Sequence, residues 1–311
     1  MRMLYPACVL ALIGALAGCG AALSGEDTGD RLPELGDVPR LTGPATPAYP
    51  LDEYLASDEE LRLLERAQAT LTEECMSRYG FAYRAELPPA PQERQNLRYG
   101  LADAQHAAEF GYALSTDGQE PARPELSLSE AEELVLFGPD GDDPFPSSWE
   151  EATESDAFVE VDGQSIPVGG CQRESYLKLY APVPDSVDIM QPQSVEQEAY
   201  TRSLEDPRVR EVSEEWSACM AEEGYAADDP VSPQTELGID GLSSPEAVAA
   251  AEADVTCKAE VNLVGVWYAV EVAYQERALE ENAEMLTSAR EQHQDRMRLV
   301  AELTGAEVGT P

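Results

Sequence analysis

The sequence predicts a mainly α protein, a disulfide-stapled helical body with one small β-hairpin and a long C-terminal helix. Apolar residues recur at helical spacing in several segments, and residue types that favour helix N-termini precede those segments. Only one short stretch alternates around a turn signal, which limits the expected strands to a single hairpin. Four cysteines follow Cys19, and an even number suggests two disulfides.

The first predicted helix begins at Ser57, because Ser57 and Glu60 have the spacing of a capping box. The apolar residues expected on one of its faces are Leu61, Leu64, Leu71 and Cys75. Gly80 is expected to end the helix in the left-handed conformation, which glycine adopts at little cost.

Shorter elements are expected in the middle of the chain. Residues 101–114 predict a short helix, and residues 129–137 predict a second one, with Ser129 or alternatively Ser127 at its N-cap. Residues 139–156 are rich in Pro, Asp and Ser and are expected to form a loop. Residues 158–168 predict a β-hairpin around an Asp-Gly turn signal, and residues 171–179 predict the helix that follows.

The second half of the chain predicts further helices. Asp206 and Pro207 are typical of an N-cap and a first helical residue, and Gly224 is expected to end that helix. Its expected apolar face carries Val209, Val212, Trp216 and Cys219. The run from Ser244 to Thr304 holds a proline only at its start. As one helix this run would be about 90 Å long, so we expect a break or bend within it.

Two parts of this C-terminal run differ in pattern. Residues 261–274 are apolar on nearly every face, as expected of a helix that is buried on several sides. Beyond Arg277 the apolar residues thin to a narrow stripe suited to packing on one partner. The stripe consists of Leu279, Leu286, Met297, Val300 and Leu303.

The charge of the chain excludes several classes of partner. The 311 residues include 61 Asp and Glu against 20 Lys and Arg, and the formal net charge is −41. Such a chain is repelled by phosphate backbones and anionic headgroups, so we expect no nucleic-acid partner and no polybasic docking to membranes. Hydrophobic residues make up 43% of the chain, close to the globular norm, so a core is expected beneath the acidic exterior.

The amino terminus resembles an export signal. Residues 1–18 begin with the positive Arg2 and continue as an apolar stretch, and Leu16-Ala17-Gly18 precedes Cys19. This arrangement resembles the lipobox of bacterial lipoproteins and predicts lipidation of Cys19, with palmitate among the attached chains. Two acyl chains give stable anchoring, so the membrane is an expected partner through this lipid.

Two alternatives to the lipoprotein signal remain open. Residues 4–23 are long enough to form an uncleaved span, and ordinary cleavage would leave a free amino terminus. After the signal, residues 19–50 are rich in Gly, Pro, Thr and Asp and are expected to form a flexible tether. We expect residues 51–185 to form a first helical unit with the hairpin. Residues 186–311 are expected to form a second unit with the long C-terminal helix.

The cysteines left after Cys8 and Cys19 are Cys75, Cys171, Cys219 and Cys257. Four cysteines allow three connectivities. Residues 75–82 and 219–226 both read C-M-x-x-x-G-aromatic-Ala, and the other two cysteines each begin a C-x-x-E sequence. The repeat predicts two related units and the disulfides Cys75–Cys171 and Cys219–Cys257. Each repeated C-M motif also predicts a helix that ends in a glycine cap, with the methionine against the aromatic residue.

Familiar catalytic and metal-binding patterns are missing from the sequence. No nucleotide-binding glycine loop, nucleophile elbow or zinc-protease motif occurs, so no catalytic residue, metal ligand or cofactor is predicted. His106 and His293 are expected to be ordinary surface or partly packed residues. Residues 140–143 contain three aspartates, which we interpret as a solvated turn in preference to a calcium site.

Several of these features together resemble secreted lipoproteins of actinobacteria that are largely uncharacterised. The resemblance is carried by Cys19, the two C-M-x-x-x-G-aromatic motifs, residues 206–209, Trp216 and residues 253–258, and it spans most of residues 50–290. It implies a location in the cell envelope and supports the predicted cysteine pairing. It implies no activity and no catalytic residues.

The leading hypothesis is a lipid-anchored protein of unknown activity on the outer face of the cell membrane. It would act as a non-enzymatic binding or interaction module, with an envelope protein as partner. The alternatives are a substrate-binding lipoprotein of a transporter and a cell-wall hydrolase with paired carboxylates. Two α/β lobes around a cleft would favour the transporter protein, and two facing carboxylates in a cleft would favour the hydrolase.

Overall fold

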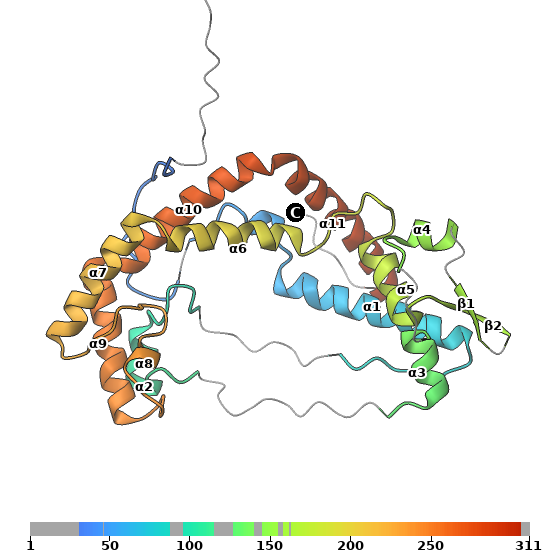
Figure 1. The fold of residues 1–311 in the computed structure, drawn as a ribbon, viewed down its shortest axis with the longest axis horizontal. Helices are drawn as coiled ribbons and strands as arrows, with labels where there is room; N and C mark the ends of the chain where they lie inside the picture. The colour runs from blue at the N-terminus through green and yellow to red at the C-terminus, as the bar shows by residue number, and fades with distance from the viewer. Residues whose placement is uncertain are drawn as a thin grey trace, which may run out of the picture. The chain divides into compact units, whose positions relative to one another are not determined.

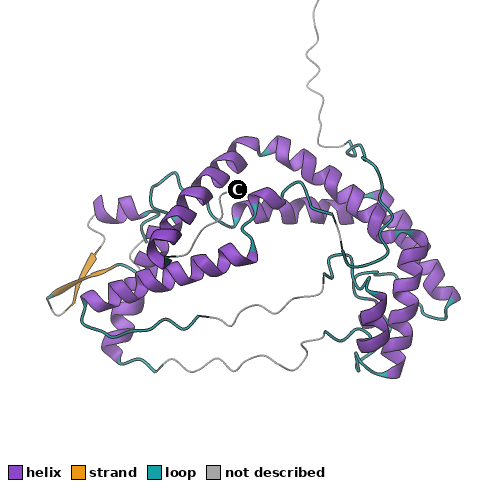
Figure 2. Cartoon of the chain, turned by 180° about the vertical axis from the view of Figure 1, so that it is seen from behind, coloured by secondary structure: helices purple, strands orange, loops and turns teal. Residues whose placement is uncertain are grey.

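The computed structural model is mainly helical, which confirms the predicted fold class (Figures 1 and 2). It describes residues 31–45, 47–87, 96–114, 127–139, 145–154, 158–161 and 163–305. By its internal contacts the chain divides into Met1–Leu32 and Pro33–Pro311, the second of which we call the helical body. The predicted signal segment, Cys19 and the acidic turn at 140–143 lie outside the described residues.

The elements are numbered in chain order, and Figure 1 labels the α-helices and the two strands among them. They are η2 (Asp52–Tyr54), α1 (Asp58–Arg78), α2 (Ala104–Phe110), α3 (Glu130–Phe137), α4 (Trp149–Glu154), β1 (Phe158–Val161), β2 (Gln164–Pro167), α5 (Gly170–Tyr180), α6 (Gln191–Leu204), α7 (Pro207–Glu222), α8 (Pro233–Glu236), α9 (Pro245–Val261), α10 (Leu263–Glu281) and α11 (Ala283–Thr304).

Capping residues define the helix starts that the sequence predicts. Ser57 and Ser129 each form a capping box with the glutamate three residues later, at the starts of α1 and α3. Asp206 caps α7 by accepting a hydrogen bond from Arg208 N, and Ser244 caps α9. The short helix expected within residues 101–114 is α2.

Both C-M motifs end their helices in the predicted way. Phe81 N donates to Met76 O at 3.2 Å, and Tyr225 N donates to Met220 O at 2.8 Å. These are the long-range bonds of a Schellman cap, and they require a left-handed residue after the helix. Gly80 and Gly224 supply it, with φ of 86° and 92°.

The C-terminal run breaks twice, as its length led us to expect. Asn262 separates α9 from α10 with a left-handed φ of 57°, and Asn282 separates α10 from α11. The apolar α10 is buried along most of its length and packs on α6, α7 and α9. The stripe on α11 packs on α1, where Met297 and Val300 join one buried cluster.

The expected apolar face of α1 is partly wrong. Leu61 is 42% exposed, whereas Leu63 and Leu64 are buried. The reason is that α11 and α5 cover the side of α1 that carries these two residues, so Leu61 faces away from the core. On α7 the expected face holds, with Val209, Val212 and Trp216 buried.

Three helices lie where the sequence predicted none, namely α4, α6 and the four-residue α8. The expected loop at 139–156 is wrong for its last part, because α4 begins at Trp149 and buries Ala152. The helix α6 begins after Met190, which provides no side-chain cap, so Pro192 in its first turn is the local signal for its start. The predicted hairpin is present as the antiparallel pair β1–β2.

Part of the segment that the sequence predicts to be a tether lies on the helical body. The division of the chain by internal contacts falls after Leu32, whereas the sequence places the end of the tether at residue 50. The Asn262 side chain accepts from Leu41 N at 3.1 Å and donates to Pro39 O at 3.0 Å. Tyr268 Oη donates to Ala48 O at 3.0 Å. These main-chain contacts act on an extended segment without depending on its side chains, so composition gave no sign of them.

Candidate functional site

Two disulfides join the helices in pairs. Cys75 of α1 is bonded to Cys171 of α5, and Cys219 of α7 is bonded to Cys257 of α9. This is the pairing that the repeated motifs suggested. The bonds close loops with sequence separations of 96 and 38 residues. Each closure stabilises the fold by roughly 4 kcal/mol on the chain-entropy model.

The two C-x-x-E sequences lie at equivalent positions in the two repeats. A carboxylate oxygen of Glu174 lies 3.6 Å from Cys75 Sγ, and one of Glu260 lies 3.6 Å from Cys219 Sγ. Each glutamate therefore touches the sulfur of the opposite half of its own bridge. Their surroundings differ, because Glu174 is buried and forms ion pairs with Arg78 at 2.6 Å and Lys178 at 2.5 Å.

The internal repeat continues past the glycine caps. Counting from the first cysteine of each motif, Glu73 of α1 corresponds to Ser217 of α7. Glu73 forms an ion pair at 2.6 Å with Arg84, which lies in the chain segment after the glycine cap of α1. The Ser217 hydroxyl donates to Ala227 O at 2.7 Å and lies 2.8 Å from Asp228 Oδ1. Asp228 therefore occupies the position in the second repeat that Arg84 occupies in the first, so the two repeats carry opposite charges at this position after their glycine caps.

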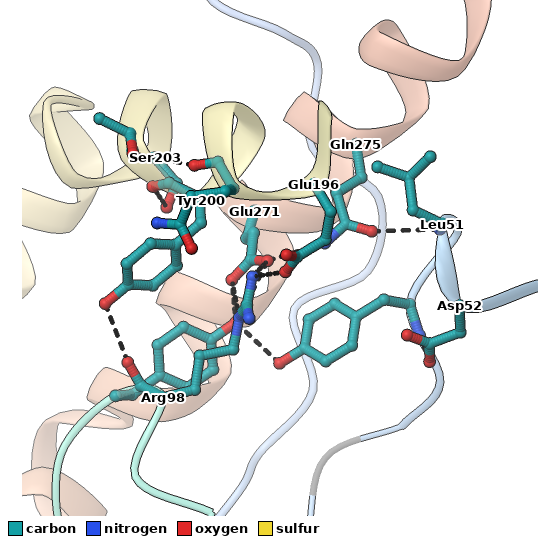
Figure 3. A network of polar contacts seen from close by, with 12 residues as sticks. Leu51, Asp52, Arg98, Glu196, Tyr200, Ser203, Glu271 and Gln275 are labelled. Atoms are coloured by element: carbon teal, nitrogen blue, oxygen red, sulfur yellow. Dashed lines mark hydrogen bonds and ion pairs between the residues drawn. The ribbon is translucent and has the colours of Figure 1, made fainter. Parts of the chain in front are cut away.

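A buried polar network lies where α6 and α10 meet two distant segments (Figure 3). Arg98 Nε donates to both Glu271 oxygens at 3.0 and 2.9 Å, and Arg98 also pairs with Glu196. The guanidinium lies between the rings of Tyr49 and Tyr200, 5.2 and 4.7 Å from their centroids. These contacts cross-link residues that are more than 200 positions apart in the sequence.

Further hydrogen bonds satisfy the rest of the network. Tyr99 Oη donates to Glu271 at 2.7 Å, so its only hydroxyl proton is used and Tyr49 donates to it at 3.0 Å. Gln275 donates to Glu271 at 2.7 Å and accepts from Leu51 N at 3.2 Å. The network therefore pins the residues just before η2 to α10.

Burial and the two carboxylates shift the pKa values in this network. Burial alone lowers the pKa of Arg98, but the hydrogen bonds and charge of Glu271, followed by Glu196, outweigh it and raise the pKa. Burial first, and then the charge of Glu271, raise the pKa of the Tyr99 hydroxyl far above its usual value. Both side chains consequently keep their protons across the physiological range.

Glu196 and Glu271 are two neighbouring carboxylates that can be compared with the pair a hydrolase would need. Glu271 is fully buried, and both side chains are bound to Arg98. A general acid needs a raised pKa and a path to substrate, whereas these carboxylates are occupied by a permanent cation. The arrangement is suited to fixing four chain segments in place.

A second buried ion pair lies beside the Cys219–Cys257 bridge. Lys258 Nζ contacts Asp254 at 3.0 Å and donates to Leu101 O at 2.9 Å, and Trp216 Nε1 donates to Asp254 Oδ1 at 3.0 Å. Burial lowers the pKa of Lys258 against the opposing charge of Asp254. Burial likewise raises the pKa of Asp254. Gly100 is required nearby, because a Cβ there would lie 2.7 Å from Lys258 Nζ.

A groove of about 780 Å³ runs along α7. Leu204, Val209, Pro230 and Trp267 supply apolar lining residues. The carboxylates lining it are Glu214, Asp228 and Asp229, and Arg210 is its only lining cation among the described residues. The groove contains no pairing of a nucleophile with a base within the described part of the chain. Its form is suited to holding a ligand or partner.

The two histidines have ordinary partners. His106 Nε2 lies 2.8 Å from Ala113 O, and His293 Nε2 lies 3.2 Å from Glu60 Oε1. Across the described ranges, no cluster of three or more His, Cys, Asp or Glu side chains is arranged to hold a metal ion. None of the described helices combines the length and apolar character needed to cross a bilayer.

Sequence reasoning did not nominate the Arg98 network, the Lys258 pair or the groove. The scarcity of lysine was the available signal, since Lys178 and Lys258 are the only two and each pairs with a buried acid. Comparison of the chain with protein-family models, curated proteins and solved structures finds no match. The function is therefore argued from the residues and their geometry.

Proposed function

We propose that this protein is a lipid-anchored, extracytoplasmic interaction module with no catalytic role, held on the outer face of the cell membrane by acylated Cys19. The observation that carries the proposal is the pair of disulfides in the helical body. Disulfides persist in oxidising compartments and are rare in the cytosol. The lipobox-like sequence before Cys19 supplies a route to such a compartment.

The fold supports an interaction role over that of a substrate-binding lipoprotein. That class is typically built from two α/β lobes, whereas the described strands form only the β1–β2 hairpin. The groove along α7 offers a surface for a partner, and an envelope protein is the partner class we propose. The resemblance to secreted actinobacterial lipoproteins supports the same location.

Metabolic labelling with palmitate tests the anchor. We expect label on the wild-type chain and on Cys8→Ala, because Cys8 lies within the signal segment and would be removed with it. Cys19→Ala should lose the label and leave the membrane fraction. Label that survives Cys19→Ala, or a wild-type chain without label, would contradict the proposal.

Surface proteolysis of intact cells or spheroplasts tests the side of the membrane. A body on the outer face should be degraded by added protease, while a cytoplasmic control protein in the same cells stays intact. Full protection of the chain under conditions that digest a known surface protein would place it elsewhere.

A further inference from the structure

We propose that the groove along α7 docks a short, basic amphipathic helix of a partner protein. This inference names the kind of partner for the interaction role proposed above and rests on that role. It draws on three properties of the groove, namely its charge, its apolar lining and its length.

The charge of the groove is unbalanced. Glu214, Asp228 and Asp229 line it, and among the described residues none of the three forms an ion pair with Arg or Lys. In the first repeat the residue equivalent to Asp228 is Arg84, which pairs with Glu73. The second repeat has a carboxylate at this position, and lysine or arginine from a partner would complement the charge of the groove.

The lining of the groove has an apolar component on a fixed support. Leu204 is 40% exposed at the end of α6, and Ala218 and Ala221 are exposed on α7. Val209 and Pro230 of the same lining are buried. Trp267 belongs to the lining, while its ring packs against Tyr99 and stacks on Tyr200 at 5.1 and 6.0 Å. Apolar side chains of a partner could therefore be buried without rearranging the core.

The shape of the groove favours a helix. The lining residues of α7 run from Val209 to Ala221, a distance of about 18 Å along the axis, which matches about 12 helical residues. Ser213, Ser217, Ala218 and Ala221 along this line are small, while Arg210 and Glu214 are the long side chains of the same lining. Small side chains allow a second helix backbone to approach closely, so the occupant with the best fit is a helix of about three turns.

Binding of a synthetic peptide to the purified full-length chain in non-ionic detergent tests the inference. The probe is an amidated Leu/Lys peptide of about 14 residues with leucines on one helical face, and its reference is a scrambled peptide of equal composition. Measurements at 0.15 M salt limit distant electrostatics, because the Debye length there is about 8 Å. We expect saturable binding of the amphipathic peptide and at least about fivefold weaker binding of the scrambled one.

Matched variants separate the groove from the general acidity of the chain. Glu214→Gln combined with Asp228→Asn should weaken binding at least about fivefold. The control Glu222→Gln with Glu223→Gln changes the net charge equally at two exposed sites that do not line the groove, namely the last residue and the C-cap of the same helix. It should leave binding within about twofold. Ala218→Trp, which fills the groove without changing charge, should weaken binding similarly, and circular dichroism checks that each variant is folded.

Three outcomes would overturn the inference. They are an absence of saturable binding, equal loss in both charge variants, and full binding by folded Ala218→Trp. None of these depends on acylation of Cys19, so the inference can fail while the anchor and the wider interaction role survive. A wild-type chain without palmitate label would contradict the anchor alone.

Discussion

The buried Lys258 is expected to contribute strongly to the stability of the fold. Its amine is 1% exposed and contacts Asp254 and the carbonyl of Leu101. We predict that Lys258→Met lowers the free energy of unfolding at pH 7 by about 3 kcal/mol, because the buried Asp254 would lose its cation. Lys178→Met is the matched control and should cost less, because Arg78 still pairs with Glu174.

Lys258→Met removes the charge that opposes the effect of burial, so it raises the pKa of Asp254 further than in the wild-type chain. An acid whose folded pKa is raised carries no penalty below its unfolded pKa, and the penalty grows as pH rises toward the folded pKa. The destabilisation should therefore shrink between pH 7 and pH 4, as measured by urea unfolding. A cost that is equal at both pH values would show that lost packing causes it.

Asp206 gives the opposite dependence. Burial raises the pKa of this carboxyl, but its hydrogen bonds with Arg208 outweigh burial and hold the pKa below the usual value. Its stabilising contribution is therefore present above the unfolded pKa and is lost as pH falls through the folded pKa. We predict that Asp206→Ala costs about 1–2 kcal/mol at pH 7 and less in acid. Asp206→Asn keeps the cap but should lose most of the pH dependence, which urea unfolding at several pH values would check.

A helix could be predicted from the sequence where residues at its own ends signal its start. The capped helices α1, α3, α7 and α9 were predictable, because each start depends on a side chain within three residues of it. The helix α6 was not, because Pro192 signals its start without a capping side chain at Met190 and the helix is stabilised by packing on α10. The Arg98 network was equally beyond prediction, since its members come from four distant segments. The cysteine pairing was suggested by the repeat, which is a property of the sequence itself.

The two disulfides should differ in their response to reductant. Cys75 and Cys171 are both fully buried, whereas Cys219 is partly exposed. Thiol–disulfide exchange requires access to a sulfur, so we predict that Cys219–Cys257 is reduced first. Timed treatment with dithiothreitol, alkylation and peptide mass spectrometry would measure the order. Labelling of Cys75 and Cys171 ahead of the other pair would contradict it.

The charge of −41 acts on the whole molecule. Self-repulsion at this charge opposes the compact state, and salt screens that repulsion. We predict that the melting temperature rises by several degrees between 0.01 and 0.5 M NaCl, with most of the rise at low concentration. A neutral solute of equal osmolality is the control and should not reproduce that early rise. A melting temperature that falls over this range would mean that the internal ion pairs dominate instead.

The attachment of the chain at Pro33 has a mechanical consequence for an anchored protein. Arg208 Nη1 donates to Pro33 O at 3.0 Å, so the body holds the incoming chain there. If Cys19 is acylated, 14 peptide steps separate the lipid from that hold, and their contour length is at most about 50 Å. A leash to residue 50 would have allowed about 110 Å. Pro33 would thus stay within about 50 Å of the acylated cysteine. A force on a bound partner would act on the hydrogen bond between Pro33 and Arg208 of α7 before it acted on the disulfides.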